Sequence, residues 1–140
     1  LSEDENKYHA FLILDVDCFK QINDIYGHAV GDIVLQKFGK LLKGTFREGD
    51  ILGRIGGDEF GVIMKNIQTK DIAMKKAEEL LAKTQAYKID ELKGNNISIS
   101  IGISTAPQDG DCYMDLYKRA DQALYQAKRS GKARVCNYFS

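Results

Sequence analysis

Three carboxylates at the ends of apolar segments suggest a metal site. Asp15 follows the apolar run 10–14, and Asp58 and Glu59 stand in a turn between two further apolar runs. If the first run is a strand beside that hairpin, the three side chains meet at one edge of a sheet. Carboxylates at such short range repel one another unless a cation neutralises them. Each acid alone also fits a solvated turn residue, but two acidic groups at strand ends favour a hard cation such as Mg²⁺.

Residues near these acids could bind an anion. Cys18 and Phe19 begin the next helical segment, where free backbone N–H groups can bind phosphate oxygens, and Lys20 lies in its first turn. A basic cluster lies at the C-terminal end of the last predicted helix and consists of Lys128, Arg129, Lys132 and Arg134. Cations are also favoured at helix C-termini because they complement the helix dipole. The basic group alone therefore does not decide between capping and phosphate binding.

Other residue patterns carry less information. Asn23 and Asp32 can supply the acceptor and donor edges that recognise guanine, although both also fit ordinary helix-end residues. The pair Gly56-Gly57 belongs to no dinucleotide or Walker fingerprint.

The histidines and the aromatic residues of the last helix are interpreted as structural. His9 and His28 have no partners at metal-site or triad spacing. Tyr117, Leu124 and Tyr125 lie at helical spacing and are assigned to the core.

The apolar pattern predicts the elements that must position the acids. The continuous run 10–14 is typical of a strand buried on both faces, whereas 97–101 alternates Ile and Ser and predicts one apolar face. Two apolar runs joined by Gly-Gly predict a hairpin. The expected strands are 10–14, 51–55, 60–64, 97–101 and 134–139, and the expected helices are 19–26, 30–43, 72–81 and 114–129. This order predicts an α+β fold with an antiparallel-rich central sheet flanked by helices.

Composition fits a single domain spanning 1–140. The net charge is zero and 44% of the residues are hydrophobic, which disfavours a nucleic-acid partner bound by bulk charge. No apolar run approaches the ~20 residues of a membrane span, so no membrane contact is expected. Cys18, Cys112 and Cys136 match no metal-ligand spacing and are interpreted as reduced thiols of a cytoplasmic protein. The polar opening at 1–7 indicates truncation of a longer parent protein.

Five sequence blocks together resemble the diguanylate cyclase family. The segment Arg-Ile-Gly-Gly-Asp-Glu-Phe resembles the family's GGDEF motif, and the other blocks resemble its D-x-D-x-F-K-x-x-N-D, Y-G-H…G-D, S-I-G-I and A-D-x-A-L-Y-x-A-K motifs. In order along the chain they occupy 14–24, 26–32, 54–60, 98–103 and 119–128. The resemblance covers residues 10 to 135 in the family's order and spacing.

The resemblance implies a fold like the polymerase palm and the nucleotide cyclase core, with a ferredoxin-like sheet. It also implies that Asp15, the Val16 carbonyl and Asp58 hold two Mg²⁺ ions, for which Mn²⁺ could substitute. Glu59 would help bind metal or activate the 3′-hydroxyl. The implied activity is condensation of two GTP molecules into cyclic di-GMP, with one GTP bound by each domain of a facing homodimer.

The resemblance assigns further residues to substrate and product. Asn23 and Asp32 would read guanine, and an R-x-x-D pair, Arg47 and Asp50, would bind cyclic di-GMP as an inhibitory product site. The triphosphate would be held by the amides of Cys18 and Phe19 and by the side chains of Lys20, Lys128 and Lys132.

Two features depart from the family pattern, and two other functions stay open. The D-x-L-T-G-L-x-N-R segment that usually precedes the first strand is absent, and Lys132-Ala133 stands where the family often has Arg-Asn. Lysine keeps the charge but loses the bidentate fork of arginine. The alternatives are a receptor that binds GTP or cyclic di-GMP without turnover, and a purely structural dimerisation module.

Overall fold

Five strands form one sheet in the computed structural model, which describes residues 7–138. The spatial order is β2-β3-β1-β4-β5, from β1 (Tyr8–Val16), β2 (Ile51–Gly56), β3 (Glu59–Ile67), β4 (Ile99–Ala106) and β5 (Val135–Asn137). The β2–β3, β3–β1 and β1–β4 pairs are antiparallel, and β4–β5 is parallel. The predicted α+β class and the antiparallel-rich sheet are therefore confirmed.

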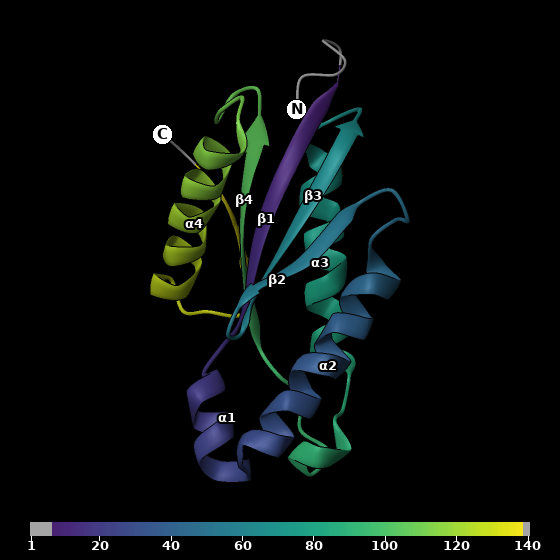
Figure 1. Cartoon of the computed structure of the whole chain (residues 1–140), viewed down its shortest axis with the longest axis vertical. Helices are drawn as coiled ribbons and strands as arrows, with labels where there is room; N and C mark the ends of the chain where they lie inside the picture. The colour runs from purple at the N-terminus through teal and green to yellow at the C-terminus, as the bar shows by residue number, and fades with distance from the viewer. Residues whose placement is uncertain (1–6, 139–140) are drawn as a thin grey trace.

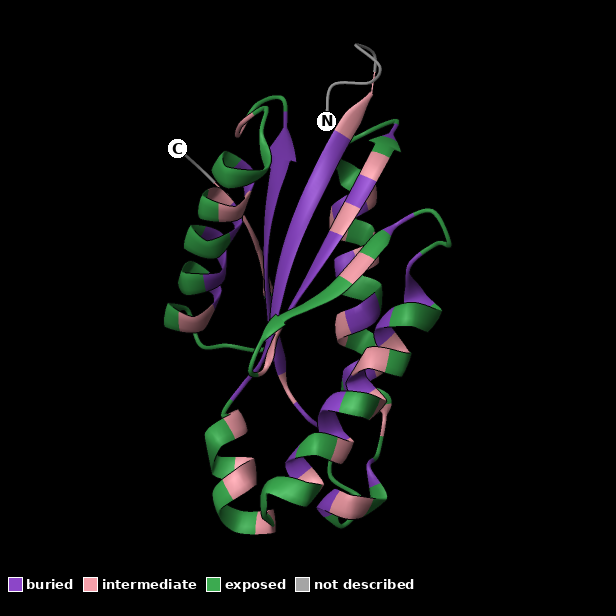
Figure 2. Cartoon of the chain, viewed as in Figure 1, coloured by how far each residue is buried: buried purple, intermediate pink, exposed green. Residues whose placement is uncertain are grey.

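The helices form a layer on each face of the sheet. They are α1 (Phe19–Tyr26), α2 (His28–Thr45), α3 (Asp71–Ala86), the short η1 (Asp90–Leu92) and α4 (Tyr113–Arg129). Helices α2 and α3 cover one face and α4 the other, while α1 lies beyond the end of the sheet, beside α2 (Figure 1). Figure 2 shows β1 and β4 buried along their length, whereas β2 is largely exposed at one edge.

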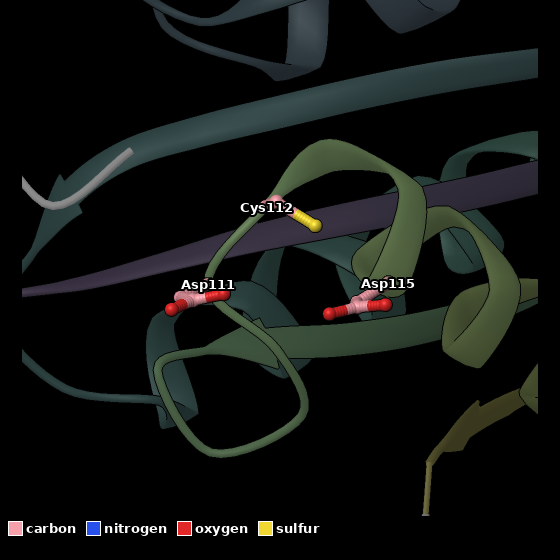
Figure 3. A group of neighbouring side chains, drawn as sticks. All are labelled: Asp111, Cys112 and Asp115. Carbon is pink, nitrogen blue, oxygen red and sulfur yellow. The ribbon is translucent and has the colours of Figure 1, made fainter.

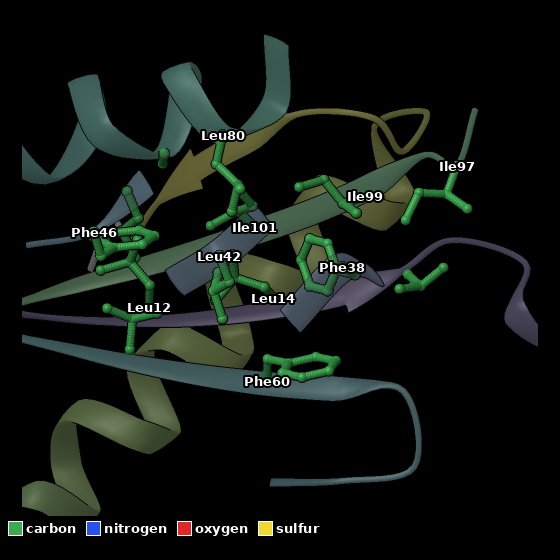
Figure 4. Close-up of a cluster of buried hydrophobic side chains, with 14 of the residues drawn as sticks. Leu12, Leu14, Phe38, Leu42, Phe46, Phe60, Leu80, Ile97, Ile99 and Ile101 are labelled. Atoms are coloured by element: carbon green, nitrogen blue, oxygen red, sulfur yellow. The ribbon is translucent and has the colours of Figure 1, made fainter. Parts of the chain in front are cut away.

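The larger core lies between the sheet and the α2–α3 layer. Leu12 and Leu14 project from β1 into this core and are fully buried (Figure 4). Phe38 of α2 meets Phe60 of β3 edge to face, with ring centroids 5.1 Å apart. Burial of each such side chain contributes about 1.5–3 kcal/mol, so this face supplies most of the stabilising apolar contact.

A smaller core lies under α4. Phe11 and Ile13, the alternate residues of β1, pack there against Leu116 and Leu124 of α4. The helix approaches the sheet closely at Gly102 of β4, where a Cβ atom would stand 2.3 Å from backbone atoms of α4. A side chain at this position would push α4 away from the sheet.

Strand β4 differs most from its prediction. It begins two residues later than expected and extends to Ala106, and both of its faces are buried. Ser100 and Ser104 are 0% exposed, and the Ser104 hydroxyl donates to the Leu116 carbonyl at 2.7 Å. The alternating Ile/Ser pattern therefore does not mark a solvent face, because hydrogen bonds satisfy the serines beneath α4.

Several other elements extend beyond their predicted ends. Strand β1 runs through Asp15 to Val16, and Glu59 is the first residue of β3 rather than part of the turn, since the β1–β3 ladder continues to the Asp15–Glu59 pair. Helices α2 and α3 are also longer than expected, and η1 was not predicted. The edge strand is shorter, and the end of its predicted range, Phe139, lies outside the described residues, as do residues 1–6. No helix within residues 7–138 has the length and apolar character to cross a membrane.

Candidate active site

The structure brings Asp15, Asp58 and Glu59, here called the acidic cluster, to one end of the sheet. Asp15 is 7% exposed and pairs across the ladder with Glu59 on one side. On its other side lies Ser100 of β4. Asp58 occupies the β2–β3 turn after Gly57, whose φ of 49° lies in the left-handed region. The hairpin thus places Asp58 of the turn and Glu59 of β3 beside the end of β1.

Burial and crowding make Asp15 electrostatically unusual. Its Oδ2 accepts a hydrogen bond from Lys128 Nζ, whereas Oδ1 is buried and has no hydrogen-bond partner among residues 7–138. Burial, and then the nearby carboxyl group of Asp58, raise the pKa of Asp15 to about 7 although Lys128 opposes the rise. Burial lowers the pKa of Lys128, but the hydrogen bond to Asp15 and the nearby charges of Asp15, Asp17 and Asp58 together outweigh it, so the pKa is raised. One ammonium group therefore does not neutralise the cluster.

The acidic cluster fits a divalent cation. A buried carboxylate oxygen without a donor carries a desolvation cost that a metal ion would offset. Every side-chain ligand atom of the cluster is an oxygen, which suits a hard cation. Burial also raises the pKa of Glu59, against the hydrogen bond from Tyr117 that lowers it.

A second acidic group is a weaker metal candidate. Asp111, Cys112 and Asp115 place their ligand atoms within 4.8 Å of one another at the start of α4 (Figure 3), a grouping that the sequence analysis did not foresee. All three side chains are exposed, so water satisfies them and no buried charge calls for an ion. The acidic cluster is therefore the candidate metal centre.

Asp17 is a site residue that sequence reasoning missed. Its carboxylate accepts hydrogen bonds from Ser98 Oγ at 2.5 Å, Ser100 Oγ at 2.7 Å and the Ala133 amide at 3.1 Å. Asp17 thus ties the loop after α4, which carries Lys132, to the end of β1. The D-x-D spacing was the available signal, because Asp17 directly follows β1 and continues its alternation from Asp15.

The predicted phosphate-binding residues are only partly gathered. Lys132 Nζ lies 3.3 Å from Cys18 Sγ, so the loop after α4 reaches the start of α1. Phe19 begins α1 and is half-buried. Lys20 is exposed in the first turn, and no hydrogen bond or ion pair of the described residues links it to Lys128 or Lys132.

Asn23 and Asp32 are carried by the two packed helices α1 and α2. Asn23 Oδ1 is buried with no partner among the described residues, and it lies against Gly31, where a Cβ atom would come within 1.9 Å. Asp32, the next residue, is exposed on the rim of a pocket of about 490 Å³. The remaining lining residues are Leu35, Gln36, Gly39, Arg54 and Phe60. Asn23 is not among the lining residues, so Asp32 is the one of the two predicted guanine-binding residues that faces this pocket.

Arg47 and Asp50 form a closed pair at the loop before β2. The Asp50 side chain is 0% exposed and accepts hydrogen bonds from Arg47 Nε at 2.8 Å and from the Arg47 amide at 3.1 Å. The guanidinium also donates to the Lys65 carbonyl and remains half-exposed. In this arrangement Asp50 orients Arg47, and only Arg47 faces solvent.

Tyr117 has a polar contact that the sequence analysis did not predict. It packs in the α4 core as expected, yet its hydroxyl donates to Glu59 Oε1 at 3.3 Å. Helical spacing identified the apolar contact of the ring but carries no information about which distant carboxylate the hydroxyl meets.

Comparisons with known proteins agree on one family. Residues 1–134 match the family described as "Diguanylate cyclase, GGDEF domain". Diguanylate cyclase A of Treponema denticola is 40% identical over 127 residues, which cover 90% of this chain and 34% of that protein. The response regulator PleD of Caulobacter vibrioides is also 40% identical, over 89% of this chain and 28% of its own length. The chain thus spans about a third, or less, of these curated relatives.

Solved structures show the same fold. The GGDEF domain of PA1120 (YfiN or TpbB) from Pseudomonas aeruginosa matches with a TM-score of 0.91 at 34% identity, covering 96% of this chain and 84% of that one. The GGDEF domain of DgcB from Caulobacter crescentus, in complex with c-di-GMP, matches with a TM-score of 0.87 at 26% identity over 97% and 81% of the two chains. The match spans nearly the whole described sheet and its helices.

Proposed function

We propose that this chain, which belongs to the GGDEF family of diguanylate cyclases, condenses two molecules of GTP into cyclic di-GMP and two of pyrophosphate. The observation that carries the proposal is the acidic cluster, in which a buried Asp15 oxygen without a partner in the described part of the chain lies beside Asp58. Diguanylate cyclases of this family generally use divalent metal ions. An alternative receptor without turnover is less well supported, since Asp58 and Glu59 of the turn are both present.

Asp15, Asp58 and the Val16 carbonyl would hold two Mg²⁺ ions, with Mn²⁺ as a substitute, and Glu59 would complete the site. When bound, the ions would neutralise phosphate charge and favour ionisation of the attacking 3′-hydroxyl. Lys128 reaches the same end of the sheet and forms an ion pair with Asp15. If Asp15 bound a metal ion, Lys128 would be available to hold phosphate oxygens.

The start of α1 and the loop after α4 would bind the triphosphate. Amides in the first turn of a helix have no intrahelical acceptor and suit phosphate oxygens. The 3.3 Å contact between Lys132 and Cys18 brings a second cation to this turn. The residues proposed to hold the triphosphate are Cys18, Phe19, Lys20, Lys128 and Lys132.

Asn23 and Asp32 would read the guanine. The Asn23 oxygen accepts and the Asp32 carboxylate accepts, which complements the N1 and N2 donors on the guanine edge. Adenine offers the opposite donor and acceptor pattern there. The buried, unpaired Asn23 oxygen would gain a partner on GTP binding.

Two domains are needed for the complete reaction. Each binds one GTP, and each 3′-hydroxyl must attack the α-phosphate held by the facing domain, so catalysis rests on positioning and charge neutralisation. A homodimer of domains is therefore part of the proposal. Arg47, oriented by Asp50, would bind cyclic di-GMP away from the acidic cluster.

The direct test is synthesis. A version of the chain fused to a dimerising helix is incubated with GTP and MgCl₂, and the products are separated by chromatography. We expect cyclic di-GMP and pyrophosphate in a ratio of one to two, and none when EDTA is present. GTP binding without any cyclic di-GMP would instead establish the receptor function.

A further inference from the structure

The Tyr117 hydroxyl is the one side-chain group within residues 7–138 that donates a hydrogen bond to Glu59. Asp15 and Glu59 thus differ in their hydrogen-bond donors. Asp15 accepts from the ammonium group of Lys128, and Glu59 accepts from a neutral hydroxyl. A glutamate side chain has more rotatable bonds than an aspartate and loses more entropy when it is fixed. A hydrogen bond that fixes the carboxylate, here called an anchor, therefore has a larger effect on the position of Glu59 than on that of Asp15.

Aromatic packing fixes the position of the Tyr117 hydroxyl. The ring centroid lies 5.9 Å from that of Phe11 on β1 and 6.1 Å from that of Tyr113 on the preceding turn of α4. Phe11 and Tyr113 are themselves 5.3 Å apart. These ring contacts limit the orientations open to the tyrosine, and the observed one places its hydroxyl against Glu59.

A single face of α4 supplies both anchors. Tyr117 and Lys128 are about three helical turns apart and therefore project from the same side. Between them lie Ala120 and Leu124, whose backbone rests directly against Gly102. The close contact leaves α4 little freedom to shift, so the two anchors keep a constant separation across the acidic cluster.

We propose that Tyr117 is a positioning residue whose hydroxyl holds the Glu59 carboxylate toward Asp15 and Asp58, and so strengthens the binding of a divalent cation by the acidic cluster. The inference rests on the metal site of the proposed function. It assigns Tyr117 no contact with substrate. Its effect on the ion passes through Glu59 alone.

Conservative variants separate the hydroxyl from the ring. Tyr117→Phe keeps the aromatic packing and removes only the donor to Glu59. Tyr113→Phe is the matched control, because Tyr113 belongs to the same ring cluster and its hydroxyl makes no hydrogen bond to the acidic cluster among the described residues. Thermal unfolding in EDTA checks that both variants keep the fold.

Metal affinity is measured without nucleotide. Mn²⁺ is titrated into the protein and the free ion is followed by electron paramagnetic resonance. We expect Tyr117→Phe to weaken binding about tenfold, within the range for residues that orient metal ligands, and Tyr113→Phe to leave it unchanged. In a Glu59→Gln background, Tyr117→Phe should have no further effect. Equal affinities of wild type and Tyr117→Phe, or an equal loss in both backgrounds, would overturn the proposal.

A second readout is independent of any metal. Carbon-13 signals of the glutamate carboxyl groups are recorded by NMR in EDTA, with Glu59→Gln to assign the Glu59 signal. We expect that signal to shift in Tyr117→Phe and to stay in place in Tyr113→Phe, and an unmoved signal would overturn the positioning role. If the wild type binds no Mn²⁺, the metal site of the proposed function fails, while the NMR comparison still decides whether Tyr117 holds Glu59.

Discussion

Strand β1 contributes alternate residues to two very different environments. On the α2–α3 face, Leu12, Leu14 and Val16 all enter the larger core. On the α4 face, Phe11 and Ile13 are apolar, but Asp15 carries a buried charge. The two faces share one backbone and the same ladder. One is apolar throughout, whereas the other ends in a carboxylate whose Oδ1 has no partner within residues 7–138.

The two faces of this strand thus have different roles: the α2–α3 face stabilises the fold, and the α4 face supplies a carboxylate for chemistry. The apolar face gains free energy from each buried side chain. The acidic end lowers the free energy of unfolding, because buried and crowded carboxylates destabilise the metal-free protein. Proteins commonly place such strain at sites of function. Residues of the two faces should therefore respond in opposite ways to substitution.

The largest expected effect is on turnover, at the acidic end. Asp58→Ala should abolish measurable cyclic di-GMP synthesis, because the remaining ligands leave the ions under-coordinated beside the phosphates. Its stability in EDTA should be retained, since a repulsion is removed. Synthesis is measured in the dimerised chain, with Asp111→Ala, an exposed acid away from the cluster, as the control. A wild-type rate of synthesis in Asp58→Ala would contradict the assignment of the acidic cluster as the catalytic metal site.

The apolar face should show the converse. Leu14 is 0% exposed, and Leu14→Ala should lower the free energy of unfolding by about 3 kcal/mol through lost contacts and a cavity. Urea denaturation measures the change, and Ile25→Ala, at a side chain 74% exposed, should alter stability by less than about 0.5 kcal/mol. A loss for Leu14→Ala no larger than that of the control would mean that this face does not dominate stability.

Base selection should depend on neither face. Asp32→Ala should reduce the preference for GTP over ATP by about 1–3 kcal/mol, because the guanine donors lose their acceptor. Competition assays with both nucleotides measure the ratio, and Asp24→Ala, on the exposed side of α1, serves as the control. An unchanged ratio would move guanine recognition to other residues.

The pH dependence of stability should distinguish the acidic end in the absence of metal. Because the pKa of Asp15 is raised to about 7 from a usual value of 3.8, the folded chain retains a proton that the unfolded chain loses. Stability in EDTA should therefore fall as the pH rises from about 4 to about 7. Thermal melts across this range test it, and Asp15→Asn should flatten the profile. An equal pH dependence of stability in Asp15→Asn would show that another titrating group causes it.

The smallest effect on the initial rate is expected at Arg47. Arg47→Ala should weaken cyclic di-GMP binding and relieve product inhibition, since the exposed guanidinium is the group that Asp50 orients. The initial rate on GTP should stay close to that of wild type. Calorimetric titration with cyclic di-GMP compares the two proteins, with Lys43→Ala as an exposed control on α2. Equal affinities would exclude this loop as the product site.

Patterns between neighbours predicted most of the fold. Apolar periodicity located helices α1 to α4 and the strand near 97–101, because a buried face imposes a period of about 3.6 or 2 residues on the chain. Continuous apolar runs and the Gly-Gly turn located β1, β2 and β3. Boundaries were less well predicted at β1, where the strand continues through the charged Asp15. The rule that a strand ends at a charge fails when the partner strand extends the ladder beyond it, as Glu59 does here.

The amino-acid sequence by itself determined the elements, the positions of the acids at strand ends, and the motif residues that identify the family. Only the tertiary structure decided three contacts. Asp17 accepts a hydrogen bond from the loop that carries Lys132, the Tyr117 hydroxyl donates to Glu59, and the buried Asp50 forms an ion pair with Arg47. The reason is physical: periodicity records which side of an element is buried, whereas these contacts depend on which distant segment packs against that side.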